Sequence, residues 1–330
     1  MEPQALEYNR SEAFNMSLFR KLGTATPDGI GILGLSVSEE YGGAGLDASA
    51  VVIVHEELSY SDPAFCLSYL AHSILFVNNL CVNGSHAQKL QWLPSACDGT
   101  NIGGMCMSEP NAGTDVLGMA TSAKYDEGAN QFILNGTKMW ITNGTVDGGQ
   151  TTGDIFLVYA KTGPKRSDIT QFVVEKGMPG FSVGQKIRDK CGMRASMTAE
   201  LVFEDVVLPQ STHVVGEVNA AMLCMMRNLE IERIALASMS LGIARRCVDE
   251  MVQYTRNRKA FGKELYQFGQ IQNYLATSYA ELMAGKRSEI SIIFCHVSIY
   301  SYRASLTLFL SLPTMFLAQD GAMYITSRII

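Results

Sequence analysis

The sequence predicts an α+β protein in which a helical N-terminal domain, a central antiparallel β domain and a C-terminal helical bundle follow one another. Apolar residues recur at three- and four-residue spacing before about Gly103 and again after about Asn219, as in amphipathic helices. Between these regions, short β-rich runs are separated by Asn-Gly, Pro-Gly and other glycine-rich turns. The predicted segments are a helical domain over 1–104, a β domain over 105–210, a partial helical domain over 211–286 and a divergent apolar tail over 287–330.

The composition fits a compact protein with a large core. The chain has 330 residues, of which 47% are hydrophobic and 18% charged, and its formal net charge is −6. This balance argues against a nucleic-acid partner, which favours a basic face. The 8 cysteines form no CxxC pair and have no histidine at metal-ligand spacing. They are therefore interpreted as small core residues in a reducing compartment, and no metal site is expected.

Two helical stretches, AVVIVHEELSY and LSYLAHSILFVNNLCV, dominate the first hundred residues. The intervening SEEYGGAGLD is predicted to be a loop, with Asp47 capping the helix that follows. Upstream, Gly29–Gly34 matches GxGxxG, but the dinucleotide-binding motif needs a strand before it and a helix after it. Pro27-Asp28 precedes the match, and the residues after it have no helical pattern. A turn between helices is the preferred interpretation.

The β domain is predicted from five runs separated by turns, which are QFILNG, DIFLVYAKT, ITQFVVEK, FSVGQKI and AELVFEDVVL. Their spacing favours an antiparallel sandwich or barrel over βαβ units. Helical spacing then returns in EIERIALASMSLGIARRCVDEMVQYTRNR and in FGQIQNYLATSYAELMAGK.

The apolar tail, 287–330, invites interpretation as a membrane span. Arg303 interrupts its middle, however, and a central arginine costs roughly 2.5–3.5 kcal/mol on insertion scales. Pro313 would break the remaining run. A membrane span is therefore not expected.

Met105–Asp115 reads MCMSEPNAGTD, and KMWITNG follows about 25 residues later. Ser108 and Thr114 offer hydroxyls, and Asn111-Ala112-Gly113 can expose backbone N–H groups, which suits the polar edge of a flavin or a phosphate. The run resembles the first signature of the acyl-CoA dehydrogenase family, and Trp140–Thr142 resembles its second flavin contact.

Further similarities follow in family order, in VEKGMPGF, CGMR and FEDV. These residues are most similar to those of the isovaleryl-CoA dehydrogenase branch, and the resemblance covers about Gln4 to Lys286. It implies FAD as the cofactor. The implied flavin contacts are Met105, Cys106, Met107, Ser108, Glu109, Pro110, Asn111, Ala112, Gly113, Thr114, Trp140, Ile141, Thr142 and, at the pyrophosphate, Arg258.

The candidate catalytic base is one of two glutamates in LEIERI. Glu230 lies three residues from both Arg227 and Arg233, which favours a solvated ion pair. Glu232 lies on an otherwise apolar helix face, where a perturbed pKa is expected. From its position alone, Glu232 could be a structural acid or a base. In the resembled branch the base comes from an L-[DE]-[LI]-E-R run on this helix, which implies that Glu232 removes the substrate's α-proton.

The same resemblance implies a set of substrate contacts, namely Thr114, Arg166, Ser167, Leu223, Glu230, Ile231, Glu232 and Arg233. After Lys286 it stops, and 287–330 has no Gly-Gly-x-Gly-Tyr loop of the kind that binds the flavin's ADP half. The chain is therefore expected to be truncated at its N-terminus and replaced after about Lys286, which leaves the helical bundle incomplete.

The first functional hypothesis is an FAD-dependent dehydrogenase that forms the α,β-double bond of a short branched acyl-CoA, similar to isovaleryl-CoA, in leucine or fatty-acid catabolism. The resemblance implies electron transfer flavoprotein as partner, a homotetramer if the bundle were complete, and the mitochondrial matrix. An alternative is a catalytically inactive truncated isoform or faulty gene product that lacks a complete FAD site. A third hypothesis is a membrane-associated protein anchored by its tail.

Overall fold

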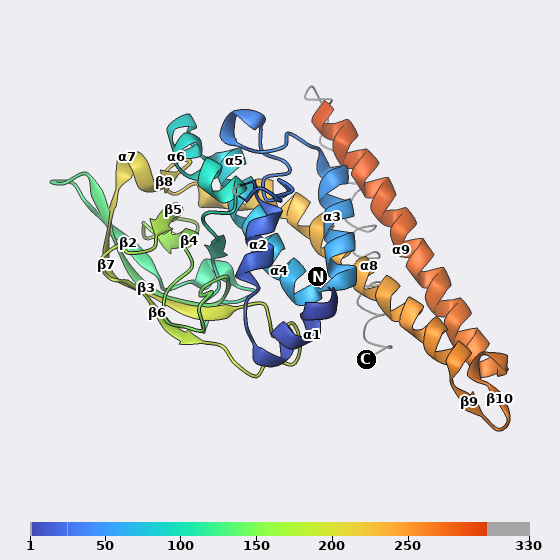
Figure 1. Ribbon diagram of the computed structural model, residues 1–330. Helices are drawn as coiled ribbons and strands as arrows, with labels where there is room; N and C mark the ends of the chain where they lie inside the picture. The colour runs from blue at the N-terminus through green and yellow to red at the C-terminus, as the bar shows by residue number, and fades with distance from the viewer. Residues whose placement is uncertain (1, 25, 302–330) are drawn as a thin grey trace. The chain divides into compact units, whose positions relative to one another are not determined.

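The computed structural model describes residues 2–24 and 26–301 (Figure 1). The chain divides into two compact units. The β unit comprises Met1–Leu46 and Leu67–Glu232, and the helical unit comprises Asp47–Cys66 and Arg233–Ile330.

The β unit contains short helices followed by the sheet. Its helical segments are α1 (Glu2–Ser11), α2 (Met16–Leu22), the 3-10 turn η1 (Glu39–Tyr41), the π-helical segment η2 (Ala71–Asn78), α5 (Asn79–Asn83), α6 (His86–Cys97), the 3-10 turn η3 (Val116–Gly118) and α7 (Gln210–His213). Helix α4 (Pro63–Leu70) leads into η2. The strands are β1 (Gly103–Cys106), β2 (Ser122–Asp126), β3 (Gln131–Thr142), β4 (Ile155–Lys161), β5 (Ile169–Glu175), β6 (Phe181–Lys186), β7 (Thr198–Pro209) and β8 (Val214–Val215).

The sheet is mixed but mainly antiparallel. Its strand order is β6-β7-β3-β2-β4-β5-β8, and β1 joins it by pairing with β4. The five predicted runs are confirmed as β3 to β7, and their ladders with one another are antiparallel. The sheet departs from antiparallel pairing at β1, which lies parallel to β4, and at one parallel pair between β2 and β4. Strand β1 has no clear strand pattern in the sequence, since GGMC is short and half glycine.

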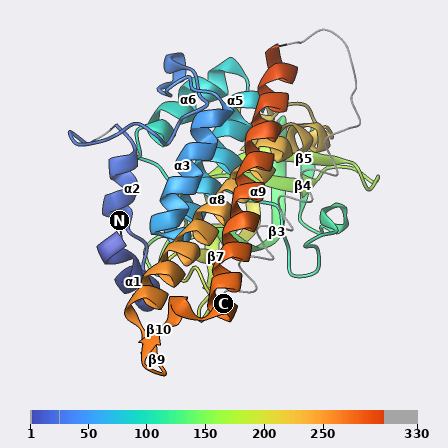
Figure 2. The ribbon, with the colours of Figure 1, turned by 90° about the vertical axis from the view of Figure 1, so that its right-hand side faces the viewer.

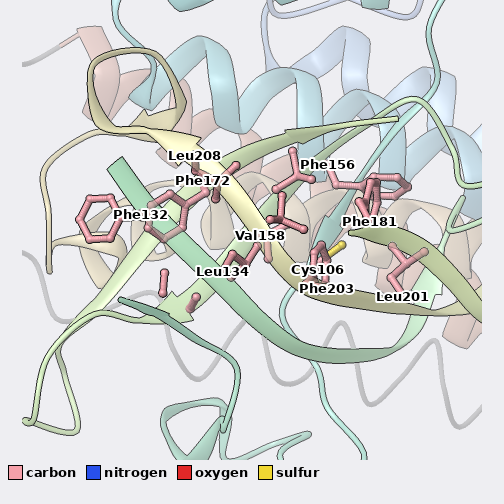
Figure 3. Close-up of a cluster of buried hydrophobic side chains, with 14 of the residues drawn as sticks. Cys106, Phe132, Leu134, Phe156, Val158, Phe172, Phe181, Leu201, Phe203 and Leu208 are labelled. Atoms are coloured by element: carbon pink, nitrogen blue, oxygen red, sulfur yellow. The ribbon is translucent and has the colours of Figure 1, made fainter. Parts of the chain in front are cut away.

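The sheet curls so that one face encloses an aromatic core (Figure 3). Phe156 on β4 and Phe181 on β6 have ring centroids 5.8 Å apart, although their strands are not neighbours in the sheet. Phe172 on β5 meets Phe132 on β3 at 5.2 Å. The opposite face of β4 and β5 packs on Phe76 and other helical side chains. Burial on both faces explains why these two strands are almost continuously apolar.

Local predictions for the N-terminal region are confirmed. The Asp47 carboxylate accepts hydrogen bonds from the amides of Ser49 and Ala50 and so caps α3 (Ala48–Ser61). The GxGxxG match forms turns without a strand or helix, and Gly31 has a left-handed φ of 70°. Four of the cysteines, Cys66, Cys97, Cys106 and Cys224, are buried as expected, whereas Cys191 is exposed.

The helical unit consists of helices that lie side by side (Figure 2). Its elements are α3, the C-terminal part of α8 (Ala221–Asn257), the hairpin β9 (Lys259–Ala260) and β10 (Lys263–Glu264), the 3-10 turn η4 (Leu265–Gln267) and α9 (Gly269–Ser301). Gly242 allows a close helix contact, because a Cβ there would lie 2.0 Å from the Ser59 hydroxyl oxygen. Arg245 on α8 pairs with Glu56 and Glu57 on α3.

Helix α9 continues through Lys286 to Ser301, so the start of the divergent tail does not coincide with the end of a helix. Arg303 and Pro313 lie outside the described residues. Within the described part of the chain, one helical stretch, Pro63–Asn83, is long and apolar enough to cross a membrane. Its most apolar window is 78% buried inside the fold, as is typical of a core helix.

Replacing a core ring tests the curled sheet. Phe172→Ala should lower the free energy of unfolding by about 3–5 kcal/mol, because Phe172 is fully buried against Phe132. Urea unfolding followed by circular dichroism measures this loss. Val207 on β7 is 43% exposed, so the free energy of unfolding of Val207→Ala should stay within about 0.5 kcal/mol of that of the parent. Equal losses for the two variants would contradict this description of the core.

A buried histidine makes stability depend on pH. Nδ1 of His72 accepts a hydrogen bond from the Gly103 amide at 2.9 Å, and Nε2 donates to the Ala96 carbonyl at 3.0 Å. Burial lowers the pKa of His72 to about 4. The unfolded chain therefore binds more protons between about pH 6.5 and 4, and stability falls as the pH drops through that window.

His72→Gln should remove this contribution, which is at most about 1.4 kcal/mol per pH unit. Urea unfolding at several pH values from 4 to 7 measures the slope. An unchanged slope would show that His72 does not stay neutral in the fold, while a uniform loss of stability at all pH values reports only the lost hydrogen bonds.

Candidate functional site

The predicted cofactor-binding run, Met105–Asp115, begins with the last two residues of β1 and continues as a loop to η3, and we call the whole run the signature loop. Its side chains divide into three groups. Cys106, Glu109 and Ala112 are buried, and Glu109 and Ala112 form an antiparallel bridge with backbone bonds of 3.0 and 3.1 Å. The exposed members are Pro110, Asn111, Gly113, Thr114 and Asp115, and Met105, Met107 and Ser108 are intermediate.

The signature loop is fastened to β3 by a buried ion pair. Lys138 Nζ lies 2.8 Å from Glu109 Oε1, and the two side chains are 0% and 6% exposed. Lys138 also donates to the Met107 carbonyl at 3.0 Å. The carboxylate of Glu109 accepts further hydrogen bonds from the amides of Ala120 and Thr121, at 2.6 and 3.0 Å. The pair thus connects Met107 and Glu109 of the loop both to β3 and to the main chain at Ala120 and Thr121.

Burial and the opposite charge compete at this pair. Burial lowers the pKa of the Lys138 ammonium, and the Glu109 carboxylate opposes that shift. Burial would raise the pKa of Glu109, but the Lys138 charge and the hydrogen bonds outweigh it and hold this pKa below its ordinary value. Glu109 therefore stays ionised near neutral pH.

Trp140 stands out in β3. The β3–β7 register shifts between Lys138 and Ile141, and within this bulge Trp140 has a φ of 61°. A bulky residue in the left-handed region is unfavourable by roughly 1–2 kcal/mol. Its indole is nevertheless 52% exposed, so burial does not compensate for the strain. A strained and exposed aromatic side chain beside a loop is typical of a ligand-binding position.

The neighbours of Trp140 in the predicted second contact lie differently. Ile141 is buried in the aromatic core, so only its main chain could contact a cofactor there. Thr142 is half-buried. Asn143 follows with a φ of 62° and donates hydrogen bonds to the carbonyls of Ser68 and Gly103, at 2.9 and 3.0 Å. The end of β3 is thereby fixed to the start of β1.

A largely buried apolar cluster includes part of the signature loop. We call it the methionine patch: Ala112, Met119, Tyr159, Ile169 and Ala221 are buried in it, and the partly buried Met105, Met107, Leu117 and Met225 pack against them. Ala221 and Met225 belong to the N-terminal end of α8, so this helix contributes to the same cluster as the loop. Half-buried methionines offer an adaptable apolar wall.

A polar group lies at the margin of the methionine patch. The Tyr159 hydroxyl accepts hydrogen bonds from the side-chain amides of Asn79 and Gln171, at 3.2 and 2.9 Å. Burial raises the pKa of Tyr159, and the charge of Glu232 adds to that rise. The sequence alone does not reveal these residues, because Tyr159 and Gln171 are single polar side chains within apolar runs and Asn79 lies in a mainly apolar helical stretch.

Amide side chains attach the start of α8 to η2 and α5 within the β unit. Asn78 donates to Asn228 at 2.9 Å, and Asn83 donates to the Cys224 carbonyl at 3.3 Å. Glu232 is half-buried and lies seven residues after Met225, on the same face of the helix. The structure thus places the predicted base on the helix face that contributes to the methionine patch.

The other predicted substrate contacts are spread along exposed edges. Arg166 forms an ion pair with Asp115 of the signature loop, which links the exposed Ser167 segment to that loop. Leu223 is 57% exposed, Glu230 is exposed, and Ile231 is buried. Two predicted contacts, Arg233 and Arg258, belong to the helical unit, and Arg258 follows the last residue of α8 and is exposed.

Three known family domains match the chain in order. They are described as the N-terminal, middle and C-terminal domains of acyl-CoA dehydrogenase, and they match residues 1–100, 104–206 and 222–288. Isovaleryl-CoA dehydrogenase of Arabidopsis thaliana is 38% identical and aligns over 88% of this chain and 68% of its own length. The chain belongs to the acyl-CoA dehydrogenase family.

Other relatives place the chain within this family. Mitochondrial isovaleryl-CoA dehydrogenase of Pongo abelii is 41% identical over 86% of this chain, and the match spans 65% of that relative. The chain thus spans slightly less than two thirds of the length of this curated relative. The alternative of an inactive chain gains no support from these two relatives, since both are named as dehydrogenases.

Solved structures share the family fold. Butyryl-CoA dehydrogenase of Megasphaera elsdenii has a TM-score of 0.86 at 31% identity, over 99% of this chain and 82% of that one. A glutaryl-CoA dehydrogenase of Mycobacterium smegmatis, solved in complex with FADH2, has a TM-score of 0.84 at 28% identity, over 100% and 79%. The predicted α+β architecture and family are confirmed.

Glycine at position 140 should relieve the strain that we infer there. Trp140→Gly should be at least as stable as Trp140→Ala, because only glycine adopts a positive φ without cost. At Lys124, an exposed position of β2 that is not among the residues with positive φ, the glycine variant should be about 0.5–1 kcal/mol less stable than the alanine variant. Thermal unfolding of the four variants gives both comparisons. The same ranking at both positions would contradict strain at Trp140.

Proposed function

We propose that this chain is an FAD-dependent acyl-CoA dehydrogenase acting on a short branched acyl-CoA such as isovaleryl-CoA. The observation that carries the proposal is the position of Glu232, on the face of α8 that contributes Met225 to the methionine patch beside the signature loop. A half-buried carboxylate on the helix face that contributes to an apolar cluster suits removal of a weakly acidic C–H proton.

The residues present fit a flavin. The strained, exposed indole of Trp140 offers a planar face, and the exposed residues of the signature loop offer hydroxyl and main-chain groups. Nothing lies within 4 Å of a Cβ built on Gly113, so the main chain there is open to a ligand. We assign the isoalloxazine contacts to the signature loop and Trp140–Thr142. Arg258 is proposed to contact the pyrophosphate, a role that suits a guanidinium.

In the proposed mechanism, bound FAD supplies the acceptor for the hydride from the substrate's β-carbon. Glu232 removes the proton from the α-carbon, and the electron pair of that C–H bond becomes part of the new double bond. The methionine patch excludes water from the acyl group. Arg166, which lies exposed between β4 and β5 and pairs with Asp115 of the signature loop, is proposed to contact the phosphates of coenzyme A.

Two observations support the proposed acyl specificity: the names of the similar relatives and the methionine side chains of the methionine patch. Relatives named isovaleryl-CoA dehydrogenase, from Pongo abelii and Solanum tuberosum, are 41% and 39% identical to this chain. Methionine side chains can adapt to a compact branched chain. Comparing kcat/KM for isovaleryl-CoA, butyryl-CoA and longer linear acyl-CoAs tests this assignment, and a preference for a long linear chain would overturn it.

The biological setting is part of the same proposal. Both relatives just cited are named as mitochondrial, which supports the mitochondrial matrix as the compartment. We propose electron transfer flavoprotein as the electron acceptor and a homotetramer as the assembly, as the family resemblance implies.

Removing the carboxylate of Glu232 tests its role as the base. Glu232→Gln should retain bound FAD but slow flavin bleaching by isovaleryl-CoA by about 10²–10⁴-fold, the usual contribution of a general base. Stopped-flow absorbance under anaerobic conditions measures this rate. Glu250→Gln, a matched change at an exposed glutamate further along the same helix, should slow bleaching by less than about tenfold. Normal bleaching by the Glu232 variant would remove Glu232 from the mechanism.

A further inference from the structure

Lys138 is a fully buried lysine to which the catalytic proposal gives no role. We propose that Lys138 and Glu109 are positioning residues for the flavin, which set the backbone conformation of Trp140 by locking the signature loop onto the β3 bulge. The inference rests on the proposed flavin site and concerns its construction.

The first support is the pattern of hydrogen bonds. Lys138 Nζ bonds to the Met107 carbonyl and to the Glu109 carboxylate, and the Met139 amide donates to the Ser108 carbonyl at 2.9 Å. Two successive strand residues therefore hold three successive loop residues. These bonds fix the register of the loop on the strand.

The second support is the location of the bulge. The Met139 amide bonds to the loop, and the β3–β7 ladder resumes its pairing at Ile141 only after a register shift. Trp140 lies within this shift and takes its left-handed backbone there. On the other side of Lys138, Gly136 has a φ of 142°, and a Cβ there would lie 2.5 Å from the Thr121 hydroxyl oxygen. The strand is therefore closely fitted to the signature loop on one side of Lys138 and to Thr121 on the other.

The third support is the chemistry of a buried pair. The free-energy cost of removing two charges from water offsets most of the attraction between them. Such a pair therefore adds little net stability compared with apolar side chains of the same size. Its directional bonds instead select one arrangement among several. Lys138 and Glu109 should accordingly influence the geometry of Trp140 more than the stability of the β unit.

Tryptophan fluorescence can report this geometry directly. The chain has 2 tryptophans, so Trp92→Phe leaves Trp140 as the single reporter. Trp92 is buried, and its indole nitrogen has no hydrogen-bond partner among the described residues, so phenylalanine sacrifices no bond there. The experiment compares Lys138→Met, Glu109→Gln and the double variant in this background, first without flavin and then during FAD titration.

Each single variant should shift the emission of Trp140, change its acrylamide quenching constant, and raise the Kd for FAD by about tenfold or more. The Kd of the double variant for FAD should exceed that of either single variant by no more than about threefold, because both changes break the same coupling. Lys89→Met is the matched control. Lys89 is half-buried in the same unit, on α6, where its ammonium lies 5.8 Å from the centroid of the Tyr41 ring, so its loss should leave Trp140 and FAD binding unchanged.

Folded Lys138→Met protein with the parent's Trp140 emission, quenching and FAD affinity would overturn the inference. If that variant does not fold, the charge-neutral double variant provides the same comparison. If the Trp92→Phe parent binds no FAD, the proposed function fails. The emission and quenching of Trp140 then still decide whether Lys138 and Glu109 set its conformation.

Discussion

The buried contact between Lys138 and Glu109 is the constraint on which the candidate site depends. It joins a loop with little regular structure to a strand that is itself part of the aromatic core. Through Ala120 and Thr121 it also fixes the chain beyond the loop. A flavin surface made of a loop and a strand bulge has few internal hydrogen bonds, so it requires such a connection to stay in one conformation before the ligand arrives.

The rest of the β unit provides a rigid base for this contact. Strands β4 and β5 are buried on both faces, between the aromatic core and the helices, and they hold Tyr159 and its amide partners in place. Asparagine side chains attach the start of α8 to the same helices. Glu232 is therefore presented from an anchored helix rather than from a mobile loop, which suits a group that has to meet a single carbon atom.

The sequence predicted the order of helices and strands well, because burial on one or two faces leaves a clear apolar pattern. It predicted the flavin-contact segments through the family motif rather than through local propensity. It did not reveal Lys138, because a lysine within a β run is usually a solvated residue, and its burial depends on Glu109 from a distant loop. The sequence could not predict the roles of Asn79 and Gln171 for the same reason, since they become partners of Tyr159 only once η2 and α5 cover β4 and β5.

Hydrogen–deuterium exchange with and without FAD tests the central claim most directly, since it reports which amides the flavin covers. The account predicts slower exchange on FAD binding at the amides of 108–115 and 139–142, where the loop and the Trp140 bulge meet. Unchanged exchange in both segments, under conditions where FAD is bound, would contradict the assignment of the isoalloxazine site to this part of the β unit.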